Sequence, residues 1–219
     1  MNEQKKRLII GISGASGVIY GIRLLEILRM VESIETHLVM SAAAKRTAIL
    51  ETDYSIEQIE ALADQTYRTS DIAASLSSGS FQTLGMVVVP CSIKTLSGVV
   101  HCYSDNLLLR AADVVLKDRR TLVLAVRETP LHLGHLRMMV EATEMGAIIM
   151  PPQPAFYHRP TSLDDIIDQT VSRILDLFGI QLEQDLFQRW QMKSGEHKGE
   201  TTLAYRDAKA LLTREQSSF

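Results

Sequence analysis

Short runs of apolar residues alternate with amphipathic helical segments along most of the chain. The runs are rich in Val, Ile and Leu without polar alternation, which is typical of strands buried on both faces of a parallel sheet. We expect strands at Leu8–Ile12, Thr36–Met40, Met86–Val89, Thr121–Val126 and Ala147–Met150. We expect helices at Val18–Val31, Ala42–Leu50, Ile56–Ala63, Asp105–Lys117, Leu133–Met145 and Leu163–Phe178. This order predicts a three-layer α/β fold, in which helices cover both faces of one parallel sheet.

The length of the chain fits one domain. Its 219 residues are enough for a large α/β domain with a substantial core. We expect this domain at residues 1–190 and interpret the polar residues 191–219 as a peripheral or assembly-linked tail. The proline-rich stretch Pro151–Pro154 is interpreted as a stiff connector inside the domain, because an amphipathic helix follows it.

Composition argues against several classes of protein. The formal net charge of −3 gives no electrostatic reason to expect nucleic acid. No stretch reaches the length of about 18 apolar residues that a membrane span needs. The first apolar run is too brief for a signal peptide, so we expect a cytoplasmic protein. Two cysteines, Cys91 and Cys102, are too few for a disulfide framework or a zinc site.

The first expected strand leads directly into a turn of small residues, Ser13–Gly17, and a helical segment begins at Val18. Such a turn binds phosphate well, because unpaired N–H groups and the helix dipole both favour an anion. The spacing of Gly11, Gly14 and Gly17 differs from the dinucleotide pattern G-x-G-x-x-G, and no ATP-type G-x-x-x-x-G-K-[ST] loop is present. A mononucleotide such as FMN fits better. The alternative is a glycine turn that only permits close packing of strand and helix.

Ligands of open parallel sheets bind beyond the carboxyl ends of the strands. In this chain, those ends are followed by hydroxyl groups, an arginine and a glutamate, in the segments Ser13–Gly17, Ser41, Pro90–Thr95, Arg127–Pro130 and Pro151–Arg159. We therefore expect a ligand site at this edge of the sheet.

Six sequence blocks, taken together, resemble the UbiX-type flavin prenyltransferases, and most of all the small members that accompany hydroxyarylic (phenolic) acid decarboxylases. In chain order, the blocks are Ile12–Gly17, Glu51–Asp53, Pro90–Leu96, Asn106–Lys117, Arg127–Pro130 and Pro154–Pro160. The resemblance covers about Leu8 to Trp190. It implies a Rossmann-like or flavodoxin-like domain that assembles into a homododecamer.

The resemblance also implies a reaction. A dimethylallyl group passes from dimethylallyl phosphate to N5 and C6 of reduced FMN, without a metal, and phosphate is released. The prenylated FMN then serves a UbiD-type decarboxylase of aromatic acids. Two alternatives remain open: an FMN-dependent decarboxylase that acts directly on a phenolic acid, and a non-catalytic FMN carrier.

The resemblance assigns roles to individual residues. Residues that match FMN-binding positions are Gly14, Ala15, Ser16, Ser41, Ser92, Ile93, Lys94, Thr95 and Arg127. Tyr157 and Arg173 match positions that contact dimethylallyl phosphate. Residues that match catalytic positions are Ser16, Glu51, Lys117, Glu128 and Trp190. Arginine suits a departing phosphate, because its planar guanidinium donates two parallel hydrogen bonds. The pocket that these residues form can lie where subunits meet.

One further motif is interpreted as structural. Residues 164–168 match the D-D-x-x-D sequence of all-helical terpenoid prenyltransferases. Thr161 or Ser162 is a ready N-cap for the following helix, and acidic residues in a first turn are favoured by the helix dipole. We therefore assign the acidic residues to capping and not to magnesium.

Overall fold

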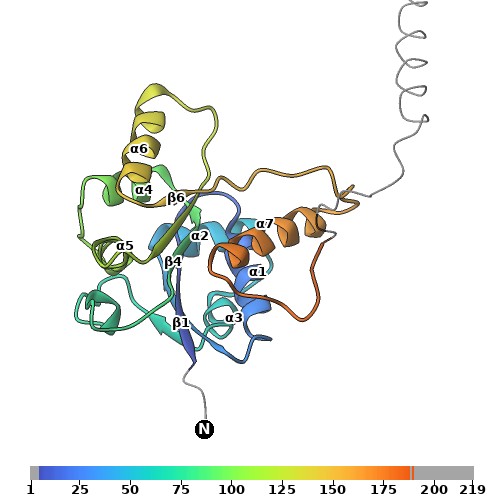
Figure 1. Cartoon of the computed structure of the whole chain (residues 1–219), viewed down its shortest axis with the longest axis horizontal. Helices are drawn as coiled ribbons and strands as arrows, with labels where there is room; N and C mark the ends of the chain where they lie inside the picture. The colour runs from blue at the N-terminus through green and yellow to red at the C-terminus, as the bar shows by residue number, and fades with distance from the viewer. Residues whose placement is uncertain (1–4, 188, 190–219) are drawn as a thin grey trace, which may run out of the picture. The chain divides into compact units, whose positions relative to one another are not determined.

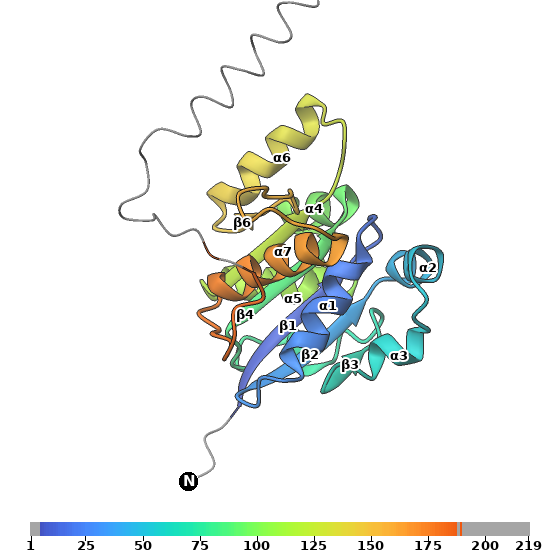
Figure 2. The same cartoon turned by 90° about the vertical axis from the view of Figure 1, so that its right-hand side faces the viewer.

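The computed structural model describes residues 5–187 and residue 189. Six parallel strands form one sheet in the order β3-β2-β1-β4-β5-β6 (Figures 1 and 2). The strands are β1 (Lys6–Ile12), β2 (Ile34–Met40), β3 (Gln65–Tyr67), β4 (Gly85–Cys91), β5 (Thr121–Val126) and β6 (Ile148–Ile149). The order changes direction between β1 and β4, which is where α/β sheets open a crevice for ligands.

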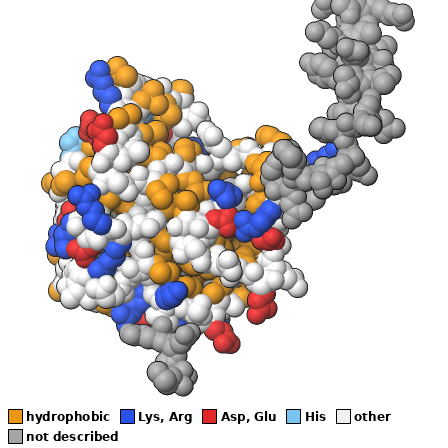
Figure 3. Space-filling view, in the orientation of Figure 1, with side chains coloured by type: hydrophobic (Ala, Val, Ile, Leu, Met, Phe, Trp, Pro, Cys, Tyr) orange, Lys and Arg blue, Asp and Glu red, His pale blue; other side chains and the backbone are white. Residues whose placement is uncertain are grey.

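Helices cover both faces of the sheet. They are α1 (Val18–Leu28), α2 (Ala42–Glu51), α3 (Ile56–Glu60), α4 (Ile93–Val100), α5 (Leu107–Lys117), α6 (Leu133–Glu144) and α7 (Leu163–Leu177), with a 3-10 turn η1 (Ser75–Ser77). Helices α1 and α7 lie side by side on one face, and α4 and α5 lie on the other (Figure 2). Apolar side chains also reach the surface over α6 (Figure 3), including Leu133, Leu136 and Val140.

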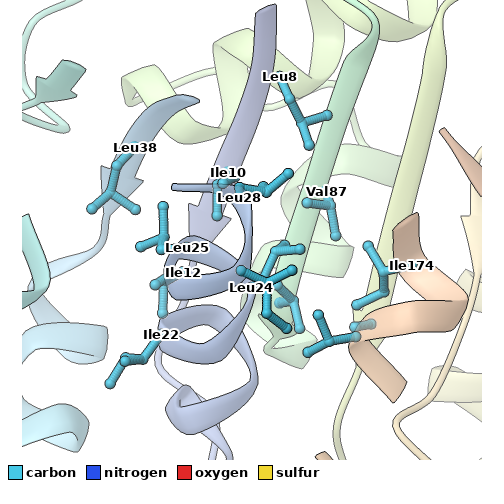
Figure 4. Packing of buried hydrophobic residues seen from close by; sticks show 14 of the residues in the cluster. Leu8, Ile10, Ile12, Ile22, Leu24, Leu25, Leu28, Leu38, Val87 and Ile174 are labelled. Carbon is cyan, nitrogen blue, oxygen red and sulfur yellow. The ribbon is translucent and has the colours of Figure 1, made fainter. Parts of the chain in front are cut away.

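Strands β1, β2, β4 and β5 each supply both halves of the core. Leu8, Ile10 and Ile12 of β1 pack with Ile22 and Leu25 of α1 in one cluster (Figure 4). Ile9 of the same strand points into the second cluster, beneath α4 and α5. The absence of polar alternation in the sequence thus reflects a sheet that is covered on both faces.

Polar N-caps fix where the helices begin. Ser41, Ser92, Asn106 and Ser162 each accept a hydrogen bond from a backbone N–H in the first turn of α2, α4, α5 and α7, respectively. At α7, the carboxylate of Asp165 also accepts a hydrogen bond from the N–H of Ser162, which completes a capping box. The expected capping role of Ser162 is confirmed.

The five expected strands and six expected helices are present, with ends that differ by up to three residues. Three short elements were missed: β3, η1 and α4. β3 has only three residues, and α4 follows β4 so closely that its residues were assigned to a strand-end loop. No described helix is long and apolar enough to cross a membrane. The predicted catalytic Trp190 and the predicted tail 191–219 lie outside the described residues.

Candidate functional site

Hydrogen bonds align the carboxyl ends of four strands. The Ser13 hydroxyl after β1 donates to the carbonyl of Pro90 at 3.0 Å and accepts from the N–H of Ser92 at 2.7 Å. The N–H of Ser41 donates to the carbonyl of Ile12, and the N–H of Arg127 donates to the carbonyl of Cys91, both at 3.0 Å. Because Ser13 is buried, its hydroxyl is committed to this bridge. The loops that follow β1 and β4 are therefore held in a fixed relation to each other.

A cavity of about 340 Å³ opens at this edge. One wall is the start of α2, with Ser41, Ala42, Ala43 and Arg46. The other wall comes from the starts of α4 and α5, with Ser92, Lys94, Thr95, Asn106, Leu108 and Leu109. Gly14 and Thr69 complete the lining. The combination of hydroxyls, two cations, helix N-termini and apolar leucines fits a ligand that has both a flat ring and a phosphate.

Five predicted flavin-binding residues line this cavity: Gly14, Ser41, Ser92, Lys94 and Thr95. Of the others, Ala15, Ser16 and Arg127 belong to the loops at the same edge, and Ile93 is the first residue of α4. The structure thus brings the predicted flavin-binding segments together.

The glycine turn packs closely against α2. A Cβ atom added at Gly14 would collide with the Cβ of Ala43. Gly17 adopts a φ of 96°, which favours glycine, and its N–H donates to the Glu51 carboxylate at 2.8 Å. Glu51, at the end of α2, therefore fixes the turn at the start of α1. This hydrogen bond was not foreseen from the sequence.

Cys91 lies at the end of β4, beside the cavity, and is fully buried. Burial raises the pKa of its thiol to about 12. The thiol is therefore protonated at neutral pH, which makes Cys91 a packing residue and not a nucleophile.

Arg127 and Glu128 follow β5 and are both exposed. The Glu128 carboxylate accepts a hydrogen bond from the N–H of Thr129 at 3.0 Å. Within the described residues, no carboxylate forms an ion pair with Arg127. Both side chains are therefore available to a ligand at this edge.

Three predicted residues lie away from the cavity of their own chain. Lys117 ends α5 at the opposite edge of the sheet, where its Nζ lies 2.6 Å from Asp118 Oδ1. Arg173 is exposed on α7 and pairs with Asp176 at 2.7 Å. Tyr157 is exposed in the loop after β6, and its ring contacts that of His158 edge to face.

Three polar lining residues, Arg46, Thr69 and Asn106, were not predicted from the sequence, and neither were the apolar Ala42, Ala43, Leu108 and Leu109. Asn106 was visible in principle, since it precedes a helix and has the side chain of an N-cap. Arg46 lies in the second turn of an expected helix, where only the position of the cavity distinguishes it from a surface cation. Thr69 follows β3, a strand that was not predicted.

Two of the three acidic residues of 164–168 serve structural roles. Asp165 caps α7, and Asp168 binds the Arg23 guanidinium through two contacts of 2.7 and 3.2 Å, which join α7 to α1. Their hydrogen bonds account for these two residues without a metal.

Comparison with known proteins decides the family. A family model described as Flavoprotein matches residues 1–175. The flavin prenyltransferase UbiX of Escherichia coli (strain K12) is 72% identical over 186 residues, which are 85% of this chain and 98% of that protein. The chain belongs to the UbiX family of flavin prenyltransferases. The flavin prenyltransferase UbiX of Thauera aromatica is 59% identical over 184 residues, 84% of this chain and 93% of that protein.

Solved UbiX structures share the fold. AnUbiX (PadA1), crystallised with FMN and dimethylallyl pyrophosphate, superposes with a TM-score of 0.83 at 49% identity, over 86% of this chain and 99% of that chain. The dodecameric FMN-dependent UbiX-like decarboxylase from Escherichia coli O157:H7 superposes with a TM-score of 0.81 at 49% identity, over 85% of this chain and 99% of that chain. The resemblance to UbiX, the flavodoxin-like fold and the transferase class, all expected from the sequence, are confirmed.

Proposed function

We propose that this chain transfers a dimethylallyl group from dimethylallyl phosphate to N5 and C6 of reduced FMN and releases phosphate. The observation that carries the proposal is the cavity at the carboxyl edge, in a chain 72% identical to a flavin prenyltransferase. The AnUbiX structure with FMN and dimethylallyl pyrophosphate supports both ligand classes. When bound, the reduced flavin supplies the electron-rich atoms that accept the allyl group.

The protein's part in binding is to hold the flavin mononucleotide at the carboxyl edge. The first turns of α2 and α4 present N–H groups to the cavity, next to the hydroxyls of Ser41, Ser92 and Thr95. Leu108 and Leu109 give the opposite wall an apolar surface. Together these groups satisfy a phosphate and exclude water from a flat ring.

The departing phosphate needs positive charge that is in place before the bond breaks. Arg127 follows β5 at the carboxyl edge of the sheet, and Arg173 and Lys117 are the further cations that we assign to this task. Because Arg173 and Lys117 lie away from the cavity of their own chain, we propose that neighbouring copies supply them. The dodecameric assembly of the relative from Escherichia coli O157:H7 supports a site shared between subunits.

The remaining predicted residues complete the site. The Tyr157 hydroxyl donates a hydrogen bond to the phosphate. The rings of Tyr157 and Trp190 stabilise the developing allyl cation through cation–π attraction. Glu128, Glu51 or the released phosphate accepts the proton lost when C6 is alkylated, and Ser16 assists that transfer. We propose that the product then serves a UbiD-type decarboxylase in the cytoplasm.

The test mixes the purified protein with reduced FMN and dimethylallyl phosphate without oxygen. A flavin whose mass rises by one C5 prenyl unit is the expected product. The two alternatives give other results. A phenolic acid that loses carbon dioxide with unmodified FMN identifies a decarboxylase, and unchanged flavin and substrate identify a carrier.

A substitution separates the roles within the site. Arg173→Ala is expected to lower the use of dimethylallyl phosphate by about 100-fold, since one charge-assisted contact to the leaving group is lost. FMN affinity should stay unchanged, because Arg173 is assigned to the phosphate of the prenyl donor. Steady-state kinetics and FMN titration measure the two quantities, and equal loss of both would make Arg173 a structural residue.

A further inference from the structure

Arg46 is a cation in the flavin cavity that no role yet explains. It lies in the second turn of α2 and lines the cavity together with Ser41, Ala42 and Ala43 of the same helix. Its position four residues after Ala42 places the two side chains on the same helix face, and side chains of a helix lean toward its N-terminal end. Its guanidinium is therefore available on the α2 wall.

The charge of Arg46 is not used elsewhere in the described chain. Five arginines form ion pairs with carboxylates: Arg7 with Glu35, Arg23 with Asp168, Arg110 with Asp113, Arg120 with Asp118, and Arg173 with Asp176. Among residues 5–187, no carboxylate pairs with Arg46. The neighbouring Lys45 differs, since it pairs with Glu60 at 2.5 Å.

The two walls of the cavity suit different parts of a flavin mononucleotide. The α2 wall has only alanines, a serine and Arg46, whereas the α4–α5 wall adds Leu108 and Leu109. A flat apolar ring is better placed on the leucines, and a dianion is better placed beside the guanidinium and the start of α2. The Ser41 hydroxyl accepts from the N–H of Ala44 at 3.0 Å and can still donate its own O–H to an anion, next to the positive charge of Arg46.

We propose that Arg46 binds the phosphate of the flavin mononucleotide and makes the site select FMN over riboflavin. This assignment rests on the proposed function, because it takes the flavin to occupy this cavity. The planar guanidinium donates two parallel hydrogen bonds to phosphate oxygens, which a lysine cannot reproduce. Riboflavin carries the same ring and ribityl chain without the phosphate, so it gains nothing from Arg46.

The test compares FMN and riboflavin on the whole protein. Flavin fluorescence gives the Kd of each for the wild type, Arg46→Met, Arg46→Lys and the control Arg29→Met. Arg29 is an exposed arginine after α1, outside the cavity lining. We expect Arg46→Met to weaken FMN binding by about tenfold or more, with riboflavin unchanged, because a hydrogen-bonded charge pair is lost. Arg46→Lys should lose less, and Arg29→Met should bind both flavins like the wild type.

Each other outcome has a distinct meaning. If Arg46→Met binds FMN as well as the wild type does, the assignment of Arg46 is overturned while the prenyl transfer proposal stands. Equal weakening of FMN and riboflavin would also overturn it, since it indicates a structural role for Arg46. A wild type that binds neither flavin would contradict the proposed function itself.

Discussion

The amino and carboxyl edges of the sheet differ in whether their cationic side chains have partners within the fold. At the amino edge, charged side chains are bound to partners within the fold: Arg120 donates to the carbonyls of Phe81 and Gly79 and to Asp118, over 2.6–3.0 Å. At the carboxyl edge, Arg46, Lys94 and Arg127 have no carboxylate partner among the described residues. One edge uses its charges for stability, and the other leaves them for a ligand. A substitution should therefore affect stability at one edge and binding at the other.

Arg120→Met tests the amino edge and should have the largest effect. The Arg120 side chain is only 13% exposed, so its removal leaves the carbonyls of Phe81 and Gly79 without this donor, while Asp118 keeps its contact to Lys117. We expect a loss of about 2 kcal/mol in the free energy of unfolding, because two partly buried carbonyls lose their hydrogen-bond donor. Denaturant titration measures this loss. The FMN affinity of the folded variant should not change. Weaker FMN binding would contradict the separation of stability at the amino edge from binding at the carboxyl edge.

Gly14→Ala tests the carboxyl edge. The new methyl group collides with Ala43 and displaces either the glycine turn or the start of α2. Overpacking of this kind costs about 1–3 kcal/mol, so we expect FMN affinity to fall by about 30-fold. Titration with FMN measures it. Gly146→Ala is the control, because no atom lies near the position of its added Cβ. The φ of 104° at Gly146 strains an alanine, so this variant should lose free energy of unfolding and keep its FMN affinity.

His37 gives the smallest predicted effect, a pH dependence of stability. His37 is buried in β2, with Nδ1 3.0 Å from the Tyr67 hydroxyl, an edge contact to Phe81, and Nε2 3.5 Å from Glu35. Burial lowers the pKa of His37, against the opposing effects of Glu35 and Asp64, and Arg7 adds to the lowering. The folded state therefore keeps the ring neutral, while the unfolded chain protonates near its ordinary pKa of about 6.5.

It follows that His37 costs no stability above about pH 6.5 and lowers it progressively as the pH falls below that value. Unfolding free energies between about pH 7.5 and 5 should drop less for His37→Asn than for the wild type. The exposed His101→Asn serves as the control. Parallel pH profiles for His37→Asn and the wild type would show that Glu35 holds the ring protonated in the fold.

The sequence predicted the sheet because its strands carry their own signal. A strand that is buried on both faces must be apolar throughout, and β1, β2, β4 and β5 are largely so. β3 lacked this signal, because its residues Gln65, Thr66 and Tyr67 are partly or fully exposed at the end of the sheet. A strand can thus be located from the sequence where both of its faces are buried, and not where it is exposed as β3 is.

The candidate site could be predicted only where residues follow strands. Ser41 and Ser92 were found in that way, because a strand end fixes their position in the parallel sheet. Arg46 lies on a helix, and its place in the cavity depends on how α2 packs on the glycine turn. Lys117 and Arg173 were assigned by resemblance, and the geometry of a single chain offers no signal for them, because neither lines the cavity of its own chain.

The burial of Cys91 has a practical consequence. The chain contains two cysteines, and only Cys102, in the turn between α4 and α5, is exposed. A thiol-specific fluorophore therefore reacts at one chemically defined position, beside the helix pair whose starts form a wall of the cavity. The protein carries a natural attachment point for an optical reporter of flavin loading, without any engineered residue.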